Sequence, residues 1–403
     1  MSIISGSKIF ARINFIFTIL FAFLIPFNNK YITYLIIPWT IVSFFLARIN
    51  KVGIKEILRS SQYFLLFYSV SLVSLIYSED FNYGIKNLET YVSFIIMPFL
   101  ILTLKTTTVK ENIKYIINAY IIGLILYIVI TLTIFLIKTD IRSLLSSLGT
   151  YSFTDDARYY RLSYIQHESY ISMYLIWGII LIVNRLFQRN SIRYFIFELC
   201  LVMIFTFYIV LLGSRAALLT LFVVTIYYIR KFLSGFPNWI SIFFTSVILI
   251  LLIVGGVKYT RIGDTILRNR KNSTSEIRIS LWSDAFEVFK DAPLFGHGIG
   301  DGLNKMVDKH NENGITEAGT LRLNAHNQFL ETATQTGIIG LVCLILILLV
   351  PLIISIRNRY ELLFLFIIII FINFLFESML VRLAGVLFLA FWQNFLILIY
   401  ERR

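Results

Sequence analysis

Residues 337–356 read GIIGLVCLILILLVPLIISI, a run of twenty residues without a charged side chain. A helix of this length crosses the hydrocarbon core of a bilayer, which is roughly 30 Å thick. The rest of the chain has a similar character, since 58% of its 403 residues are hydrophobic, 15% are charged and the mean hydropathy is +0.80. No soluble domain has this composition, so the sequence predicts an all-α integral membrane protein.

Apolar stretches of this kind recur along the chain and predict about twelve transmembrane helices. They lie at residues 10–27, 31–47, 62–77, 90–104, 115–137, 170–187, 194–212, 216–229, 239–257, 337–356, 362–376 and 383–399. A long polar break separates the ninth stretch from the tenth. The sequence thus predicts three parts: residues 1–257 with helices one to nine, a large and partly helical loop at 258–336, and residues 337–403 with helices ten to twelve.

The distribution of the 36 Lys and Arg residues predicts how the chain crosses the membrane. If the N-terminus lies inside, the inner segments hold 18 of these residues, the short outer loops hold 7, the long break holds 10 and one lies at a border. Cytoplasmic loops of membrane proteins collect positive charge. We therefore expect both termini in the cytoplasm and the long break outside. This pattern also explains the net charge of +13 without nucleic acid as a partner.

The first apolar stretch and the two cysteines have simple interpretations. No small-residue cleavage site follows the first stretch, so we interpret it as a retained helix and not as a signal peptide. Cys200 and Cys343 fall inside predicted helices, where a thiol behaves as a small apolar group, and they predict neither a disulfide nor a metal site. Glu198, inside the seventh stretch, is either an interfacial glutamate or a buried carboxylate with a partner or a function.

Two outer segments are long enough to fold over the membrane, residues 139–168 and 258–336. The first segment is rich in Tyr and contains Arg158 and Arg161. One interpretation is an ordinary solvated loop. The other is a contact surface for a sugar chain or a phosphate, since aromatic rings and planar guanidinium groups suit both ligands.

The second segment predicts two helices around a turn-rich centre. Ser273 and Glu276 form a capping box, and Pro293 ends the helix that begins there. The apolar stripe of this helix consists of Ile277, Leu281, Ala285 and Val288. Residues 294–320 are rich in Gly and Asn and are expected to be loop. Asn324 is expected to cap a second helix that runs to Gly337.

Three residues stand out because each lies near a predicted helix N-terminus: Arg215, Arg278 and His326. The helix dipole disfavours a cation there, yet a guanidinium and free N–H groups can bind phosphate oxygens together. The alternatives are a membrane-interface anchor for Arg215 and a surface arginine for Arg278. The same dipole favours a neutral imidazole at His326, which could accept a proton from a hydroxyl. A structural histidine is the alternative for His326.

Other candidate motifs are weaker. GHGIGDG at residues 296–302 looks like a glycine-rich phosphate loop, but no strand precedes it and no Lys-Ser or Lys-Thr pair follows, so we expect a turn. His297 and His310 lack partners at the spacing of metal ligands. We therefore expect neither a metal site nor a cofactor.

Three stretches resemble the O-antigen ligase and polymerase superfamily, which comprises polytopic glycosyltransferases that use polyprenyl-diphosphate-linked glycans. The stretches are GSRAALLT (213–220), EIRISLWSDAFEVFKDAPLFGHGIG (276–300) and NAHNQFLETATQTGIIGL (324–341). QHESYISMYL (166–175) resembles a segment that precedes a transmembrane helix in some members. The resemblance implies that Arg215 and Arg278 bind the diphosphate and that His326 is the base acting on the acceptor hydroxyl. It also implies direct attack on the anomeric carbon, which inverts its configuration, without a metal ion.

The resemblance leads to a first hypothesis, an O-antigen ligase in the bacterial inner membrane with its large loop in the periplasm. Such an enzyme takes a glycan from a carrier such as undecaprenyl diphosphate and attaches it to an acceptor such as lipid A core, within lipopolysaccharide biosynthesis. The alternative is an O-antigen or exopolysaccharide polymerase that joins lipid-linked repeat units. A transporter of lipid-linked oligosaccharides is a third hypothesis, which the six prolines and few midplane charges disfavour. A non-enzymatic scaffold would not need His326.

Overall fold

The computed structural model of the chain describes residues 2–27, 29–104, 106–138, 165–186, 191–233 and 274–401. Within these ranges all regular structure is helical, which confirms the predicted all-α class. The helices are α1 (Ser2–Leu24), α2 (Asn29–Ile49), α3 (Ile54–Ser74), η1 (Leu75–Tyr77), α4 (Phe81–Tyr91), α5 (Ser93–Leu102), α6 (Thr106–Lys138), α9 (Glu168–Leu186), α10 (Ile192–Leu212), α11 (Arg215–Phe232), α14 (Thr274–Asp291), α15 (Gly302–Glu312), α16 (Thr316–Thr320), α17 (Gln328–Arg357), α18 (Glu361–Phe376), η3 (Met379–Val381) and α19 (Leu383–Glu401).

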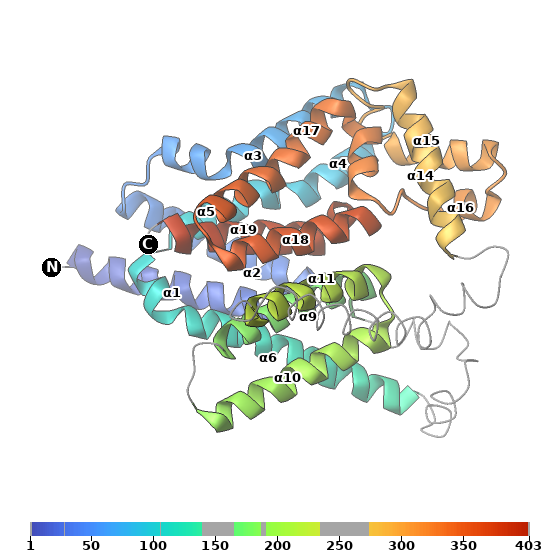
Figure 1. Cartoon of the computed structure of the whole chain (residues 1–403). Helices are drawn as coiled ribbons and strands as arrows, with labels where there is room; N and C mark the ends of the chain where they lie inside the picture. The colour runs from blue at the N-terminus through green and yellow to red at the C-terminus, as the bar shows by residue number, and fades with distance from the viewer. Residues whose placement is uncertain are drawn as a thin grey trace.

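The long helices lie side by side in one bundle, with both ends of the chain at one end of it (Figure 1). Helices α14, α15 and α16 lie at the opposite end. Helix α17 packs against α3 and α18, while α9 packs against α10, α11 and α18. Large aromatic side chains, including Trp177, Phe366 and Trp392, are fully buried in a common core.

Eight stretches of helix in the described ranges are long and apolar enough to cross a membrane. They are Tyr31–Ile49, Ile54–Tyr77, Phe81–Leu102, Asn112–Ile137, Glu168–Leu186, Ile192–Leu212, Gln328–Arg357 and Leu383–Tyr400. The stretches predicted at 10–27, 216–229 and 362–376 coincide with α1, α11 and α18, the last a shorter apolar helix. The stretch predicted at 239–257 lies outside the described residues. A multi-pass membrane protein is therefore confirmed, and the count of twelve helices stays a prediction.

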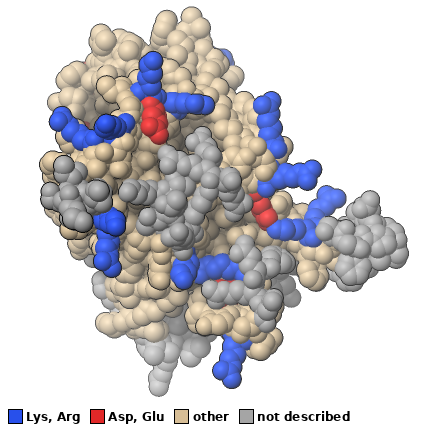
Figure 2. Space-filling model, turned by 90° about the vertical axis from the view of Figure 1, so that its left-hand side faces the viewer, with Lys and Arg blue, Asp and Glu red and all other residues tan. Residues whose placement is uncertain are grey.

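The bundle end that carries the chain termini is rich in basic side chains. Figure 2 looks onto this end and shows Lys and Arg spread across it, with few Asp and Glu. Several of these basic residues lie at the C-terminal ends of helices: Arg48, Lys231 and Arg357 are in the last turns of α2, α11 and α17. A cation is favourable there because the helix dipole is negative at the C-terminus.

The helices of the long polar break were predicted only in part. Helix α14 ends at Asp291, shortly before Pro293, and its stripe residues Leu281, Ala285 and Val288 are buried, as predicted. The cap predicted at Ser273 lies outside the described residues. The prediction of a loop over 294–320 was wrong for α15 and α16.

Helix α15 forms because it buries an apolar side chain against its neighbours. Met306 is fully buried and packs with Ala285, Val288 and Ala325 in a small core of its own, separate from the core of the bundle. Such tertiary contacts outweigh the low helix propensity of Gly and Asn.

Helix α17 is interrupted at Gly337, which has φ +64° and ψ −159°. The second loop helix and the tenth apolar stretch therefore meet there, as predicted. The amides of His297 and Gly298 donate to the carbonyls of Thr334 and Gln335, at 2.9 Å each. The segment 293–301, which we call the clamp loop, thus supplies partners to carbonyls that the interruption would otherwise leave without one.

The clamp loop also binds the junction between α3 and α4. Ser74 Oγ accepts a hydrogen bond from the amide of Ile299 at 3.2 Å. The Asp301 carboxylate accepts from the amides of Glu79 and Asp80, at 2.7 and 2.9 Å, and so satisfies donors at the start of α4. The turn expected at GHGIGDG is confirmed, and its role in this fold is to join two helices that are distant in sequence.

The interruption of α17 requires a glycine, so we expect Gly337→Ala to lower the free energy of unfolding by about 2 kcal/mol or more. The backbone of Gly337, with φ +64° and ψ −159°, lies in a region that is essentially restricted to glycine and costs another residue roughly 1–3 kcal/mol. In addition, a Cβ at Gly337 would lie 2.3 Å from the Leu294 carbonyl oxygen. Thermal unfolding of the purified protein in detergent measures the loss. Gly314→Ala is the matched control, since Gly314 has φ +75° but no atom within 4 Å of its added Cβ. Equal losses in both variants would contradict the close packing of the clamp loop.

Candidate functional site

His326 lies immediately before α17, at the bundle end that carries α14. The N-cap of α17 is Asn327, whose side-chain oxygen accepts from the amides of Phe329 and Leu330. The predicted cap at Asn324 is therefore wrong. Its side-chain oxygen accepts instead from the amide of His326 at 3.0 Å, and the backbone of His326 has φ +44°. The sequence NAHN has an Asn at 324 and at 327, and either could cap the helix. Because His326 between them has a left-handed backbone, the helix begins after Asn327.

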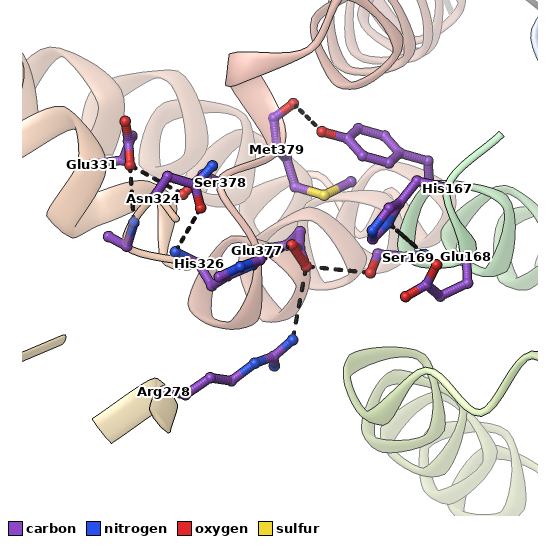
Figure 3. A network of polar contacts seen from close by, with 12 residues as sticks. His167, Glu168, Ser169, Arg278, Asn324, His326, Glu331, Glu377, Ser378 and Met379 are labelled. Carbon is purple, nitrogen blue, oxygen red and sulfur yellow. Dashed lines mark hydrogen bonds and ion pairs between the residues drawn. The ribbon is translucent and has the colours of Figure 1, made fainter. Parts of the chain in front are cut away.

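The side chain of His326 is paired with Glu377, the residue that follows α18 (Figure 3). His326 Nδ1 lies 2.6 Å from Glu377 Oε1. Burial alone would raise the pKa of Glu377. The hydrogen bond from His326 and the charges of His326, His167 and Arg278 outweigh burial and hold that pKa below the usual range of a glutamate.

The ionised state of Glu377 determines how His326 can act. A carboxylate accepts hydrogen bonds and does not donate them, so Nδ1 of His326 carries a proton. In the neutral ring, Nε2 is then left as the proton acceptor.

The second oxygen of Glu377 faces residues from two further elements. Arg278 of α14 places Nη2 at 3.9 Å from Oε2, and Ser169 of α9 donates its hydroxyl to the same oxygen at 3.3 Å. The Arg278 side chain is 25% exposed. A contact of 3.9 Å is a loose ion pair, and a guanidinium carries five N–H donors in all. The structure therefore joins His326 and Arg278 through one buried carboxylate (Figure 3).

Glu331, in the first turn of α17, holds the two chain segments that carry this pair. Its side chain is fully buried, and Oε2 accepts from the Ala325 amide at 3.2 Å and the Ser378 hydroxyl at 3.3 Å. Oε1 accepts from Gln335 Nε2 at 2.9 Å. Ala325 precedes His326 and Ser378 follows Glu377, so one side chain fixes both neighbours of the pair.

Further polar contacts hold the segment that contains Glu377. Gln328 Oε1 accepts from the Leu380 amide at 2.6 Å, and Asn327 Nδ2 donates to the Leu375 carbonyl at 3.3 Å. From α9, the Tyr170 hydroxyl donates to the Met379 carbonyl at 3.1 Å. The residues at the start of α17 and α9 thus secure the irregular chain between α18 and α19.

Arg215 is the first residue of α11, and Ser214 Oγ accepts from the Ala217 amide at 3.4 Å, which confirms the predicted cap. The helix that begins with Arg215 packs against α9 and α18, the helices that present Ser169 and Glu377. Arg158 and Arg161 lie outside the described residues. Among the residues that are described, no three His, Cys, Asp or Glu side chains form a group that could hold a metal ion.

Sequence reasoning missed Glu377, Ser169 and Glu331 as members of the site. Glu377 is the first charged residue after the apolar run 362–376. A carboxylate at the end of a transmembrane stretch is costly unless it has a partner, and this was a usable signal. Ser169 lies within QHESYISMYL, a stretch noted only for its resemblance. Glu331 gave no signal, because an acid in the first turn is common in any helix.

Glu377 should stabilise the fold at neutral pH and lose this effect in acid. Its lowered pKa means that its contribution is fully present above the pKa of an unfolded glutamate, about 4.3. The contribution then falls as the pH drops through the lower value of the folded state. We expect the difference in melting temperature between wild type and Glu377→Gln not to shrink from pH 7 to about 5 and to shrink below. A difference that already shrinks between pH 7 and 5 would show that the pKa is raised instead.

We expect Glu331→Gln to destabilise the protein by about 1–3 kcal/mol, the usual cost of a buried polar group without a partner. All three partners of Glu331 are donors, and the new amide would turn a fourth donor toward them. The local effect should be faster hydrogen–deuterium exchange in the peptide that contains Ala325. The exposed Glu312 of α15 gives the control, Glu312→Gln. Unchanged exchange at Ala325 would mean that Glu331 does not hold the segment before His326.

Part of the chain matches a known protein family. Residues 199–345 match the family described as O-antigen ligase, and this range contains Arg215, Arg278 and His326. A stretch of 92 residues is 35% identical to an uncharacterized protein of Haemophilus influenzae (strain ATCC 51907 / DSM 11121 / KW20 / Rd). That match covers 23% of this chain and 23% of the relative. Over this range, the family match supports the resemblance of the chain to the O-antigen ligase and polymerase superfamily.

Proposed function

We propose that this chain is a membrane glycosyltransferase that moves a glycan from a polyprenyl diphosphate to a hydroxyl group of an acceptor sugar. The observation that carries the proposal is the pairing of His326 with Glu377 at 2.6 Å, with Arg278 on the other oxygen of the same carboxylate. In this proposal, His326 is a base and Arg278 an anion-binding group, and the two lie together at one end of the bundle. Glycosyl transfer from a diphosphate needs both.

The base in this proposal is His326. Glu377 accepts the hydrogen bond from Nδ1 and orients the ring, and Nε2 takes the proton of the acceptor hydroxyl as its oxygen attacks the anomeric carbon. Glu377 also stabilises the imidazolium that forms, as carboxylates do in other histidine-based sites. The new bond joins the acceptor oxygen to the anomeric carbon. Attack from the face opposite the diphosphate inverts the configuration of that carbon.

The arginines act on the leaving group. The bond between the anomeric carbon and the diphosphate oxygen breaks, and its electron pair leaves with the polyprenyl diphosphate. Guanidinium groups of Arg278 and Arg215 would stabilise the charge that develops on the diphosphate, so the proposal requires no metal ion. Arg278 is suited to this role because its ion pair with Glu377 is loose and its side chain is partly exposed.

The orientation in the membrane follows from charge. The basic end of the bundle in Figure 2 carries the chain termini and is assigned to the cytoplasm, since positive charge collects on that side. The end with α14, α15, α16 and Glu377 then faces the periplasm of a bacterial inner membrane. Polyprenyl-linked glycans and their acceptors would meet at that face.

The acceptor distinguishes two versions of the function. A ligase transfers the glycan to a lipid A core or another surface acceptor, whereas a polymerase transfers it to a second lipid-linked repeat unit. Both use the same base and the same diphosphate site. We propose the ligase first and keep the polymerase as the alternative, to be decided by the products in a strain that lacks the gene.

We expect His326→Ala to reduce glycan transfer by about 10²- to 10⁴-fold, the usual contribution of a positioned general base. The measurement is complementation of a deletion strain with wild type or variant, followed by gel analysis of surface polysaccharide. Loss of attached glycan with accumulation of long lipid-linked chains indicates a ligase. Loss of long chains with single repeats still attached indicates a polymerase.

His297→Ala is the matched control for this experiment. His297 lies in the clamp loop with Nε2 2.8 Å from the Val288 carbonyl oxygen, and it is outside the Glu377 network. This variant should keep most of the transfer activity once its amount in the membrane is taken into account. Full complementation by His326→Ala would overturn the proposed enzyme and leave a transporter or scaffold.

A further inference from the structure

A second buried pair of a histidine and a carboxylate lies outside the site, between α14 and α15. His310 Nδ1 is 2.6 Å from Asp284 Oδ2, and the two side chains are 0% and 4% exposed. The other oxygen of Asp284 accepts from Asn313 Nδ2 at 2.7 Å. A buried carboxylate is costly unless such partners are present. The positions of these three side chains are therefore more closely constrained than those of a surface ion pair.

The same imidazole also touches the chain that leads to His326. His310 Nε2 lies 3.3 Å from the carbonyl oxygen of Leu323, three residues before His326. Asp284 in turn lies six residues after Arg278 on one continuous helix. The His310 ring therefore connects the helix that carries Arg278 with the segment that carries His326.

The pair adds directional hydrogen bonds to the apolar contact between these two elements. The apolar core here consists of Ala285, Val288, Met306 and Ala325, with Leu303 and Leu330 at its edge. Two of its four buried members are alanines, so the apolar contact here is small. Charge-assisted hydrogen bonds are strong and directional, so they constrain the distance between α14 and the segment before His326 more narrowly than the apolar contact does.

We propose that His310 and Asp284 are positioning residues that set the distance between Arg278 and His326. The inference rests on the proposed function, in which Arg278 holds the donor diphosphate and His326 activates the acceptor. In that reaction the acceptor oxygen must meet the anomeric carbon in line with the leaving group. A misplacement of about 1 Å can cost on the order of 10²-fold in rate.

The chain provides a matched control on the same two helices. Lys309, beside His310 on α15, pairs with Glu287 of α14 at 3.2 Å, and the Glu287 side chain is 41% exposed. This surface pair joins α14 to α15 without reaching Leu323. Exposed pairs of this kind contribute little, so Lys309→Met should leave transfer within about 3-fold of wild type.

The first experiment compares kinetic constants of His310→Phe, His310→Asn and Lys309→Met in reconstituted membranes, per folded protein. We expect His310→Phe to lower kcat by about 10- to 100-fold with little change in KM for the donor, because alignment and not binding is lost. His310→Asn should recover only part of kcat, since its amide can donate to Asp284 from a position close to that of Nδ1 but does not reach the carbonyl of Leu323. In a His326→Ala background, His310→Phe should cause no further loss.

The second experiment measures the geometry without any activity. Spin labels at the exposed positions Ser283 and Thr320, in a chain whose two cysteines are replaced, report the distance between α14 and the segment before His326. We expect one narrow distance distribution in the parent protein and in the Lys309→Met variant. The His310→Phe variant should give a broader or shifted distribution.

The outcomes separate this inference from the proposed function. Unchanged kcat and an unchanged distance distribution in His310→Phe would overturn the positioning role. The role would also be overturned if His310→Phe lowered kcat by the same factor in the His326→Ala background as in wild type. Absence of transfer by the wild-type protein would overturn the proposed function instead. The spin-label distances would then still decide whether His310 fixes the two elements.

Discussion

The interruption of α17 at Gly337 is the constraint on which the bundle end with α14, α15 and α16 depends. A helix that spans the membrane without interruption satisfies its own backbone groups and offers none to a partner. The interruption frees the carbonyls of Thr334 and Gln335, and the clamp loop uses them. The same loop binds the start of α4 through Asp301. One short segment therefore connects α14, α17 and the junction between α3 and α4.

Buried carboxylates organise the rest of this end. Asp284, Asp301, Glu331 and Glu377 are each at most 7% exposed, and each accepts hydrogen bonds from at least two groups. A carboxylate offers about four acceptor positions, so it can join several chain segments at one point. Apolar packing holds the bundle, whereas these acceptors hold the irregular segments between its helices. The division is physically reasonable, since an irregular backbone exposes donors that only acceptors can satisfy.

Local patterns predicted the elements well and their partners poorly. Hydrophobic length predicted apolar helices, capping chemistry predicted the start of α11 at Ser214, and the start of an apolar stretch predicted the junction at Gly337. These features depend on residues close in sequence. Helix α15 and the pairing of His326 with Glu377 depend on residues far apart, and the sequence alone carries no distance between them. The cap of α17 was misplaced for a related reason, because the left-handed backbone of His326 is not encoded by its side chain.

The distances around Glu377 show how one carboxylate can serve two cationic groups. It lies 2.6 Å from His326 and 3.9 Å from Arg278, so the histidine is its principal partner. Coulomb attraction weakens with distance, and the longer contact is the one that a bound anion can replace at little cost. A diphosphate that engages Arg278 would leave the bond between Glu377 and His326 in place. In the proposed reaction the donor and the base would therefore not compete for the same partner.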